Sequence, residues 1–309
     1  MTAPPATGPP AVVAEPAVPL ISPAPLAPPA DFGPLDRARG WAMTAVIVAL
    51  ATLTRFLNLG SPTDAGTPIF DEKHYAPQGW QILGNHGVED NPGYGLVVHP
   101  PVGKQLIAIG EALFGYSGLG WRFTGALLGV ILVAVVARTV RRITRSTLVG
   151  AIAGLLLIAD GVSFLAARTA LLDGFLTFFV VAAFGALIVD RDQVRQRMHV
   201  AFCEGRIAET RWGPRLGVRW WRFGAGVLLG LACATKWSGL YFVVFFAVLS
   251  LGFDVAARRA YRTPRPWLGT LRRDLGPTGY ALGLIPFGVY LASYAPWFAS
   301  ETGINRHEE

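Results

Sequence analysis

Residues 148–189 read LVGAIAGLLLIADGVSFLAARTALLDGFLTFFVVAAFGALIV. The stretch holds two apolar runs on either side of Arg168, and each approaches the ~20 residues that a helix needs to cross a bilayer. Asp160, Arg168 and Asp173 are the only charged residues in it. Charges inside membrane segments are costly and usually functional. The stretch therefore predicts a helical membrane protein with a polar site.

The composition supports the same class. Of 309 residues, 52% are hydrophobic and 15% charged, and the mean hydropathy is +0.42, whereas a soluble domain carries about 25% charged residues. The net charge of +7 comes from arginines in short loops between apolar segments, so we expect a membrane rather than nucleic acid as partner. We predict an all-α, polytopic fold with about seven transmembrane segments: 41–59, 121–140, 148–166, 169–189, 221–236, 237–254 and 277–297.

The arginines predict an orientation in the cytoplasmic membrane. Basic groups lie before the first segment, after the second, in residues 190–222 and in residues 258–273. If every segment crosses, all four groups fall on the cytoplasmic side. The Pro- and Ala-rich residues 1–34 are then a disordered cytoplasmic tail, because proline at this density prevents a helix. The loop 60–120 faces outward.

An acidic pair, Asp71-Glu72, opens this outer loop. Residues 67–75 resemble the entry to a short helix, where two acids meet the helix dipole favourably, and this structural role is the alternative to a functional one. A carboxylate at a membrane surface also suits a base that acts on a lipid-carried substrate. Adjacent helix positions differ by about 100°, so we expect one acid to face the reacting hydroxyl and the other to orient a partner or bind substrate.

A second polar string, His99-Pro100-Pro101-Val102-Gly103-Lys104, precedes an amphipathic stretch over 102–115. We expect an interfacial helix with Lys104 near the lipid headgroups. Lys236 and Arg122 lie at outer ends of segments and could instead snorkel to headgroups. The histidines lack the tight spacing of metal ligands, so no cofactor is expected, with a divalent metal left open.

One further alternative concerns the charges of the opening stretch: Asp160 and Arg168 could form a structural salt bridge. Arg168 and Asp173 are five residues apart, roughly 140° around an ideal helix, so we expect them to find partners elsewhere rather than to pair. The charges share one leaflet side with the acidic pair, which favours a common cavity.

Taken together, these features resemble the protein O-mannosyltransferases, multi-spanning glycosyltransferases of the C superfamily (GT-C type), and most of all their bacterial, actinobacterial branch. The matching stretches are Phe-Asp-Glu-Lys-His-Tyr at 70–75, His-Pro-Pro-Val-Gly-Lys at 99–104, Arg-Thr-Ala-Leu-Leu-Asp at 168–173 and Ala-Thr-Lys-Trp-Ser-Gly at 234–239. The acidic pair marks the superfamily, whereas the His-Pro-Pro and Lys-Trp strings point to this family. The resemblance covers a transmembrane glycosyltransferase domain from about residue 35 to residue 309.

The resemblance implies inverting transfer of mannose from polyprenyl phosphate mannose to Ser or Thr hydroxyls of exported proteins. It makes Asp71 the base, with Glu72 as the second catalytic residue. The departing lipid phosphate needs basic groups to offset its charge. The residues expected to bind the donor phosphate or substrate are His99, Lys104, Arg168, Asp173 and Lys236. The expected partners are this donor, the acceptor proteins, membrane lipid and the export machinery, with no nucleic acid.

Family members continue through several more membrane segments, so we expect this chain to be the N-terminal part of a longer protein. Three other functions stay open. The chain could use another lipid-linked sugar, such as a pentose or aminosugar. It could be a transporter, although the charges are biased to the outer face and no internal repeat is evident. It could also be an inactive membrane subunit that pairs with a homologue.

Overall fold

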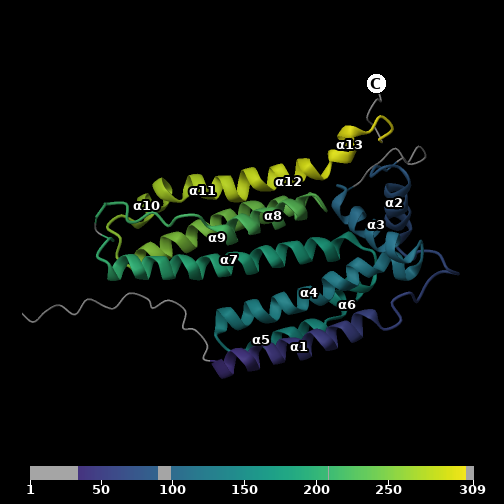
Figure 1. Ribbon diagram of the computed structural model, residues 1–309, viewed down its shortest axis with the longest axis horizontal. Coiled ribbons are helices and arrows are strands. Elements are labelled where there is room, and N and C mark those ends of the chain that lie inside the picture. The colour runs from purple at the N-terminus through teal and green to yellow at the C-terminus, as the bar shows by residue number, and fades with distance from the viewer. Residues whose placement is uncertain (1–33, 90–98, 208, 304–309) are drawn as a thin grey trace, which may run out of the picture.

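The computed structural model describes residues 34–89, 99–207 and 209–303, and these form an elongated helical bundle without a β-strand (Figure 1). The predicted all-α class is confirmed. The predicted tail, residues 1–34, lies outside the described residues except for Pro34, which begins α1. The helices are α1 (Pro34–Phe56), α2 (Glu72–Gly84), α3 (Val102–Phe114), α4 (Gly118–Thr144), α5 (Thr147–Ala159), α6 (Gly161–Arg168), α7 (Leu172–Cys203), α8 (Trp220–Cys233), α9 (Gly239–Ala260), α10 (Pro266–Arg273), α11 (Leu275–Gly279), the π-helical turn η1 (Tyr280–Leu284), α12 (Ile285–Ser293) and α13 (Ala295–Ala299).

Several helices are long and apolar enough to cross a membrane, which makes this a multi-pass membrane protein. By length and composition, four qualify among the described residues: α4, α7, α9 and the continuous run from α11 through α12. A fifth forms if α5 and α6, bent by 65° at Asp160, count as one span. The predicted number of seven is not confirmed, because α8 has only 14 residues and α1 carries both Arg39 and Arg55.

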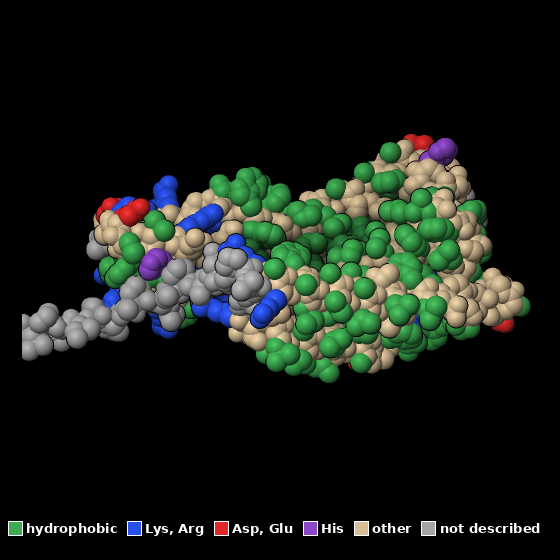
Figure 2. All heavy atoms as spheres, turned by 60° about the horizontal axis from the view of Figure 1, so that its bottom comes forward, with side chains coloured by type: hydrophobic (Ala, Val, Ile, Leu, Met, Phe, Trp, Pro, Cys, Tyr) green, Lys and Arg blue, Asp and Glu red, His purple; other side chains and the backbone are tan. Residues whose placement is uncertain are grey.

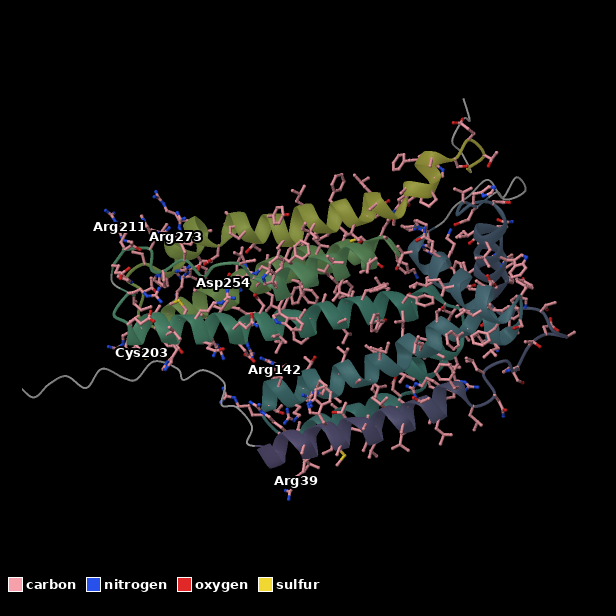
Figure 3. The ribbon with its side chains drawn as sticks, viewed as in Figure 1. Arg39, Arg142, Cys203, Arg211, Asp254 and Arg273 are labelled. Carbon is pink, nitrogen blue, oxygen red and sulfur yellow. The ribbon has the colours of Figure 1, made fainter. Side chains whose placement is uncertain are left out.

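The bundle has two chemically different ends. At one end, here called the loop end, lie α2, α3 and the turns that join α6 to α7 and α8 to α9 (Figure 1). At the other end, here called the basic end, lie α10, the α4–α5 turn and the C-terminal turns of α7. Arg142, Arg211 and Arg273 are found at this end (Figure 3). On the face shown in Figure 2, hydrophobic side chains are widespread between the two ends, and few charged side chains are visible there. The expected separation of the outer-loop groups from the arginine clusters is therefore confirmed.

Small residues let the helices approach closely, as is usual in membrane bundles. A Cβ added to Gly226 on α8 would lie 1.8 Å from the carbonyl oxygen of Ala281 in η1. A Cβ on Gly110 of α3 would lie 2.3 Å from the carbonyl oxygen of Gly120 in α4. The second contact fixes α3, and with it the polar string before α3, against the central helix α4.

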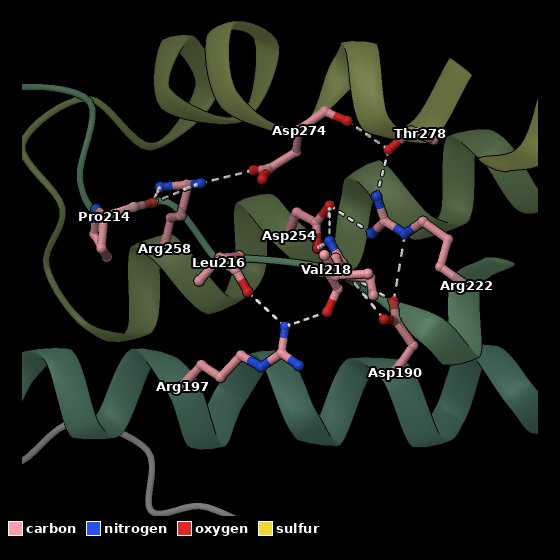
Figure 4. A network of polar contacts seen from close by, with 11 residues as sticks. Asp190, Arg197, Pro214, Leu216, Val218, Arg222, Asp254, Arg258, Asp274 and Thr278 are labelled. Atoms are coloured by element: carbon pink, nitrogen blue, oxygen red, sulfur yellow. Dashed lines mark hydrogen bonds and ion pairs between the residues drawn. The ribbon is translucent and has the colours of Figure 1, made fainter. Parts of the chain in front are cut away.

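Buried arginines and aspartates fasten the basic end (Figure 4). Arg219 donates from Nε to Asp190 Oδ1 (2.9 Å) and from Nη1 to Asp254 Oδ1 (2.8 Å). Arg222 donates from Nη2 to Asp254 Oδ2 (2.7 Å) and from Nη1 to the hydroxyl of Thr278. These residues come from α7, α8, α9 and α11, so one charge network joins four helices.

This network is not predicted from the sequence. Charge alone leads to the expectation that the third basic group, in 190–222, lies in a loop. In the structure α7 continues to Cys203, and Arg219 and Arg222 are 8% and 0% exposed. They are buried because Asp190 and Asp254, each 2% exposed or less, neutralise them.

Replacing Asp254 by Asn tests the network. The change leaves two buried guanidinium groups without a full counter-charge, so we expect it to lower the free energy of unfolding by about 3–5 kcal/mol. Thermal unfolding in detergent measures the loss. Arg206→Gln is the control, since it breaks an exposed pair with Glu204 and should cost no more than about 1 kcal/mol. Equal losses in the two variants would contradict this assignment.

Candidate active site

The acidic pair stands at the first turn of α2. Asp71 is the N-cap residue, and its carbonyl oxygen accepts hydrogen bonds from the backbone N–H groups of His74 and Tyr75. Glu72 is the first helical residue and is 0% exposed, whereas the Asp71 side chain is half-buried. The predicted short helix is confirmed, and the two carboxylates do point into different surroundings.

Glu72 is held in a bidentate ion pair with Arg122 of α4. Arg122 donates from Nε to Oε1 and from Nη2 to Oε2, both at 2.7 Å. The remaining donors of Arg122 reach the carbonyl oxygens of Leu59 (3.0 Å) and Pro62 (2.9 Å), and Glu72 also accepts from the backbone N–H of Ala170 (2.9 Å). Such paired, charge-assisted bonds are strong and directional. The pair therefore fixes the start of α2 relative to α4, the end of α1 and the α6–α7 turn.

Asp71 has no such partners. Within the described residues, its carboxylate makes no hydrogen bond or ion pair. Burial raises the pKa of Tyr75, one turn further along α2, and the negative charges of Asp71 and Asp173 raise it further. Asp71 and Asp173 therefore both lie close enough to Tyr75 to act on it electrostatically. An unpaired, partly accessible carboxylate can accept a proton.

His99 and Lys236 complete this cluster. Lys236 Nζ lies 2.8 Å from Asp173 Oδ1, and the rings of His99 and Tyr75 are 6.1 Å apart. Burial lowers the pKa of His99, as do Lys236 and Lys104, while Asp173 and Asp71 oppose the shift. The lowered pKa favours the uncharged imidazole of His99, which can both donate and accept a hydrogen bond. The Lys-Trp string at the loop end thus lies close to residues from three separate stretches: 70–75, 99–104 and 168–173.

An aromatic wall, formed by Trp237, Tyr290 and Tyr294, continues from Lys236. Trp237 Nε1 donates to the hydroxyl of Tyr290 (3.2 Å), which in turn donates to that of Tyr294 (3.4 Å). Trp237 is 69% exposed, so one ring face is free for a ligand. The sequence analysis missed the two tyrosines, because their only signal is a four-residue spacing in the last apolar segment.

Lys104 lies elsewhere than expected. It is 1% exposed and forms an ion pair with Glu89, which is 7% exposed. Burial raises the pKa of Glu89 and lowers that of Lys104, and each charge opposes the shift of the other. The side chain turns inward because Lys104, Ile107, Ala108 and Glu111 share the buried face of α3. The expectation that the Lys104 side chain is exposed to lipid headgroups is therefore wrong, because the side chain is buried against Glu89.

Arg168 also has a structural environment. Its Nη1 donates to the carbonyl oxygens of Thr54 (3.0 Å), Arg55 (3.1 Å) and Leu57 (2.7 Å), and its Nη2 donates to that of Asn58 (3.1 Å). The guanidinium thus caps the C-terminus of α1, where a positive charge is favourable. It forms no salt bridge with Asp160, which instead caps α6 through Ser163 N (2.7 Å). Arg168 and Asp173 do not pair, as expected.

The predicted site residues therefore divide into two groups. Asp71, His99, Asp173 and Lys236 come together, with Tyr75 added by the structure. Glu72, Lys104 and Arg168 have buried or capping partners close by. Among the described residues, no group of three or more His, Cys, Asp and Glu side chains is arranged to hold a metal ion.

A buried carboxyl group lies at the contact between α2 and α3. Glu111 of α3 is 1% exposed, and neither carboxylate oxygen has a hydrogen-bond partner among the described residues. It faces Gly79 of α2, where an added Cβ would lie 2.7 Å from Glu111 Oε2. Burial raises the pKa of Glu111 to about 8. The α2–α3 contact is thus built for the neutral form of this side chain.

The two acids of the pair should differ in their effect on stability. Glu72→Gln leaves the buried Arg122 charge uncompensated, so we expect a loss of about 3–5 kcal/mol in the free energy of unfolding. Asp71→Asn removes no described contact and should change stability by less than about 0.5 kcal/mol. Thermal unfolding of both purified variants measures the difference. A larger loss for Asp71→Asn than for Glu72→Gln would overturn this division of roles.

The Glu111 carboxyl should make stability depend on pH. Its pKa is about 8 when folded and lies near the ordinary value of 4.5 when unfolded, so the folded state binds the extra proton between these values. This contribution is complete below about pH 4.5 and declines as pH rises toward 8. Glu111→Gln should remove the decline, so the variant gains stability relative to the parent between pH 5 and pH 8. A constant difference across that range would contradict the account.

Comparison with known proteins shows which sequences the chain resembles. The family described as dolichyl-phosphate-mannose-protein mannosyltransferase (PMT) matches residues 117–300. The polyprenol-phosphate-mannose--protein mannosyltransferase of Mycobacterium tuberculosis is 80% identical over 293 residues, which are 95% of this chain and 56% of that protein. The protein of the same name in Corynebacterium glutamicum is 47% identical over 85% of this chain.

A more distant relative is protein O-mannosyl-transferase 2 of Drosophila melanogaster, 27% identical over 70% of this chain and 26% of that protein. The chain spans little more than half the length of the bacterial relatives, 56% and 52% of the two proteins above. The family match covers more than half of the chain and includes Arg122, Asp173 and Lys236. The chain belongs to the dolichyl-phosphate-mannose-protein mannosyltransferase (PMT) family.

Proposed function

We propose that this chain carries the catalytic loop of an enzyme that transfers mannose from polyprenyl phosphate mannose to Ser or Thr hydroxyls of exported proteins. The observation that carries the proposal is the unpaired carboxylate of Asp71, close enough to Tyr75 and His99 to act on their pKa values, at the end of the bundle away from the basic loops. The names of the bacterial relatives support the donor and the protein acceptor. The positive-inside rule supports an outer-face site and a cytoplasmic N-terminus.

The reaction uses Asp71 as the base. The acceptor hydroxyl has a pKa far above 7, so a positioned carboxylate must take its proton as the oxygen attacks the anomeric carbon. The new carbon–oxygen bond forms as the bond from that carbon to the phosphate oxygen breaks, which inverts the configuration and releases polyprenyl phosphate. Glu72 acts through Arg122 as a positioning residue, because all its described contacts hold the start of α2.

Lys236 offsets the charge of the departing phosphate. Its ammonium group has three N–H donors and gives one to Asp173, so two remain for phosphate oxygens. Neutral His99 is placed to hydrogen-bond the sugar or the acceptor. The aromatic wall offers Trp237 as an apolar surface beside the leaving group. Lys104 and Arg168 support the site through Glu89 and the end of α1 rather than by touching the donor.

The competing functions predict other features. A transporter would place its polar groups near mid-bilayer, whereas this cluster gathers at one end of the bundle. A different lipid-linked sugar stays compatible with the acidic pair alone, but the His-Pro-Pro and Lys-Trp strings and the relatives favour mannose. The protein export machinery is a further proposed partner, since the acceptor must reach the outer face as an unfolded chain.

Replacing Asp71 by Asn should abolish transfer while leaving membrane insertion intact. We expect a rate loss of about 10²–10⁴-fold, the usual contribution of a general base. The assay follows mannose transfer from polyprenyl phosphate mannose to a Thr-rich peptide in membranes, with the 309-residue chain and with a form extended through any downstream coding sequence. Unchanged turnover would remove Asp71 as the base. No transfer by any correctly inserted form would favour another lipid-linked sugar.

Lys236→Gln should weaken the reaction through the donor phosphate. Losing one charged hydrogen bond predicts a drop of about 10- to 100-fold in kcat/KM for polyprenyl phosphate mannose. Lys73→Gln is the matched control, because Lys73 is an exposed lysine on α2 with the same charge. Equal losses for the two lysines would show a general charge effect and contradict the assignment.

A further inference from the structure

The basic end contains a groove that the proposed reaction does not use. It lies between the C-terminal half of α7, the segment 206–218 and the start of α8, with a volume of about 660 Å³. That size is within the range of small-ligand sites. Three arginines line it, Arg197, Arg206 and Arg215, and no acidic residue among those that the structure describes does.

The arginines of the groove keep donors available. Arg197 uses Nη1 to bind the carbonyl oxygens of Leu216 and Val218, and within the described residues its Nε and Nη2 have no partner (Figure 4). Arg215 is exposed and has no described partner. Arg206 pairs with Glu204 outside the groove, and both side chains are about half exposed, 42% and 52%. The groove thus carries a net positive charge with unused N–H groups.

An apolar rim borders these donors. Val200, Val218 and Trp220 line the groove and are 45%, 64% and 71% exposed. Trp220 and the neighbouring Trp221, 45% exposed, begin α8. Exposed tryptophans at a helix start are typical of the membrane–water interface, where the ring lies at headgroup level. Positive charge and apolar surface therefore meet at one depth of the bundle.

We propose that this groove binds the headgroup of an anionic phospholipid, with the phosphate on Arg197, Arg206 and Arg215 and the glycerol and upper acyl carbons on the apolar rim. The proposed orientation places the basic end on the cytoplasmic side of the membrane, where basic pockets between helices are suited to such headgroups. Inorganic phosphate shares the arginine chemistry but leaves the valines and Trp220 uncovered. The rim therefore favours a lipid over a free anion. The proposal does not depend on the proposed reaction.

Lipid retention by the purified chain tests this site. Native mass spectrometry in detergent counts bound lipid as phosphatidylglycerol or phosphatidylcholine is added. The double variant Arg206→Gln/Arg215→Gln should bind phosphatidylglycerol at least about tenfold more weakly, since each arginine near a headgroup contributes about 1 kcal/mol. The control Arg211→Gln/Arg259→Gln removes two exposed arginines of the same end outside the groove and should retain binding within about twofold.

A second variant and a competitor separate the alternatives. Val218→Asp places a carboxylate on the rim and should weaken phosphatidylglycerol binding without affecting phosphatidylcholine. Millimolar inorganic phosphate should leave the bound lipid in place. Equal loss in groove and control variants would overturn the proposal in favour of diffuse surface charge. Displacement by phosphate would overturn the lipid assignment in favour of a free-anion site. Thermal unfolding confirms that each variant is folded.

Discussion

The buried ion pair between Glu72 and Arg122 is the contact on which the loop end depends. It joins the start of α2 to α4 and, through the other donors and acceptors, to the backbone after α1 and before α7. Both side chains are almost fully buried, so neither charge can be left alone without a large cost. The pair leaves Asp71, the preceding residue, half-buried and without a described side-chain partner. One acid thus holds the loop end together, and the other is the base in the proposed reaction.

Much of this arrangement could be predicted from the sequence. Apolar length predicted the helical membrane class, and the positions of Asp71, His99, Asp173 and Lys236 relative to the segments predicted their convergence. The helix start at Glu72 followed from the acidic first turn. These features depend on local composition and on segment parity, which a single sequence records.

The partners of the buried charged residues could not be predicted. They depend on the direction in which each side chain points, which the composition of a segment does not determine. Lys104 and Glu111 turn inward because α3 packs on α2 and α4, and Glu89 is the partner that makes burial of Lys104 tolerable. Arg168 turns to the end of α1 because four carbonyl groups there lack helical partners. In the sequence, Arg219 and Arg222 resemble loop arginines. In the structure they are buried, because α7 and α9 place Asp190 and Asp254 next to them. Tertiary packing selected each of these partners.

A double-mutant cycle on Glu72 and Arg122 tests the central claim most directly. The free energy of unfolding is measured for Glu72→Gln, Arg122→Gln and the double variant. If the pair organises the loop end, the double variant loses much less than the sum of the single losses, because removing both charges leaves none buried alone. Additive losses would contradict the account, since they would show that the two side chains act independently.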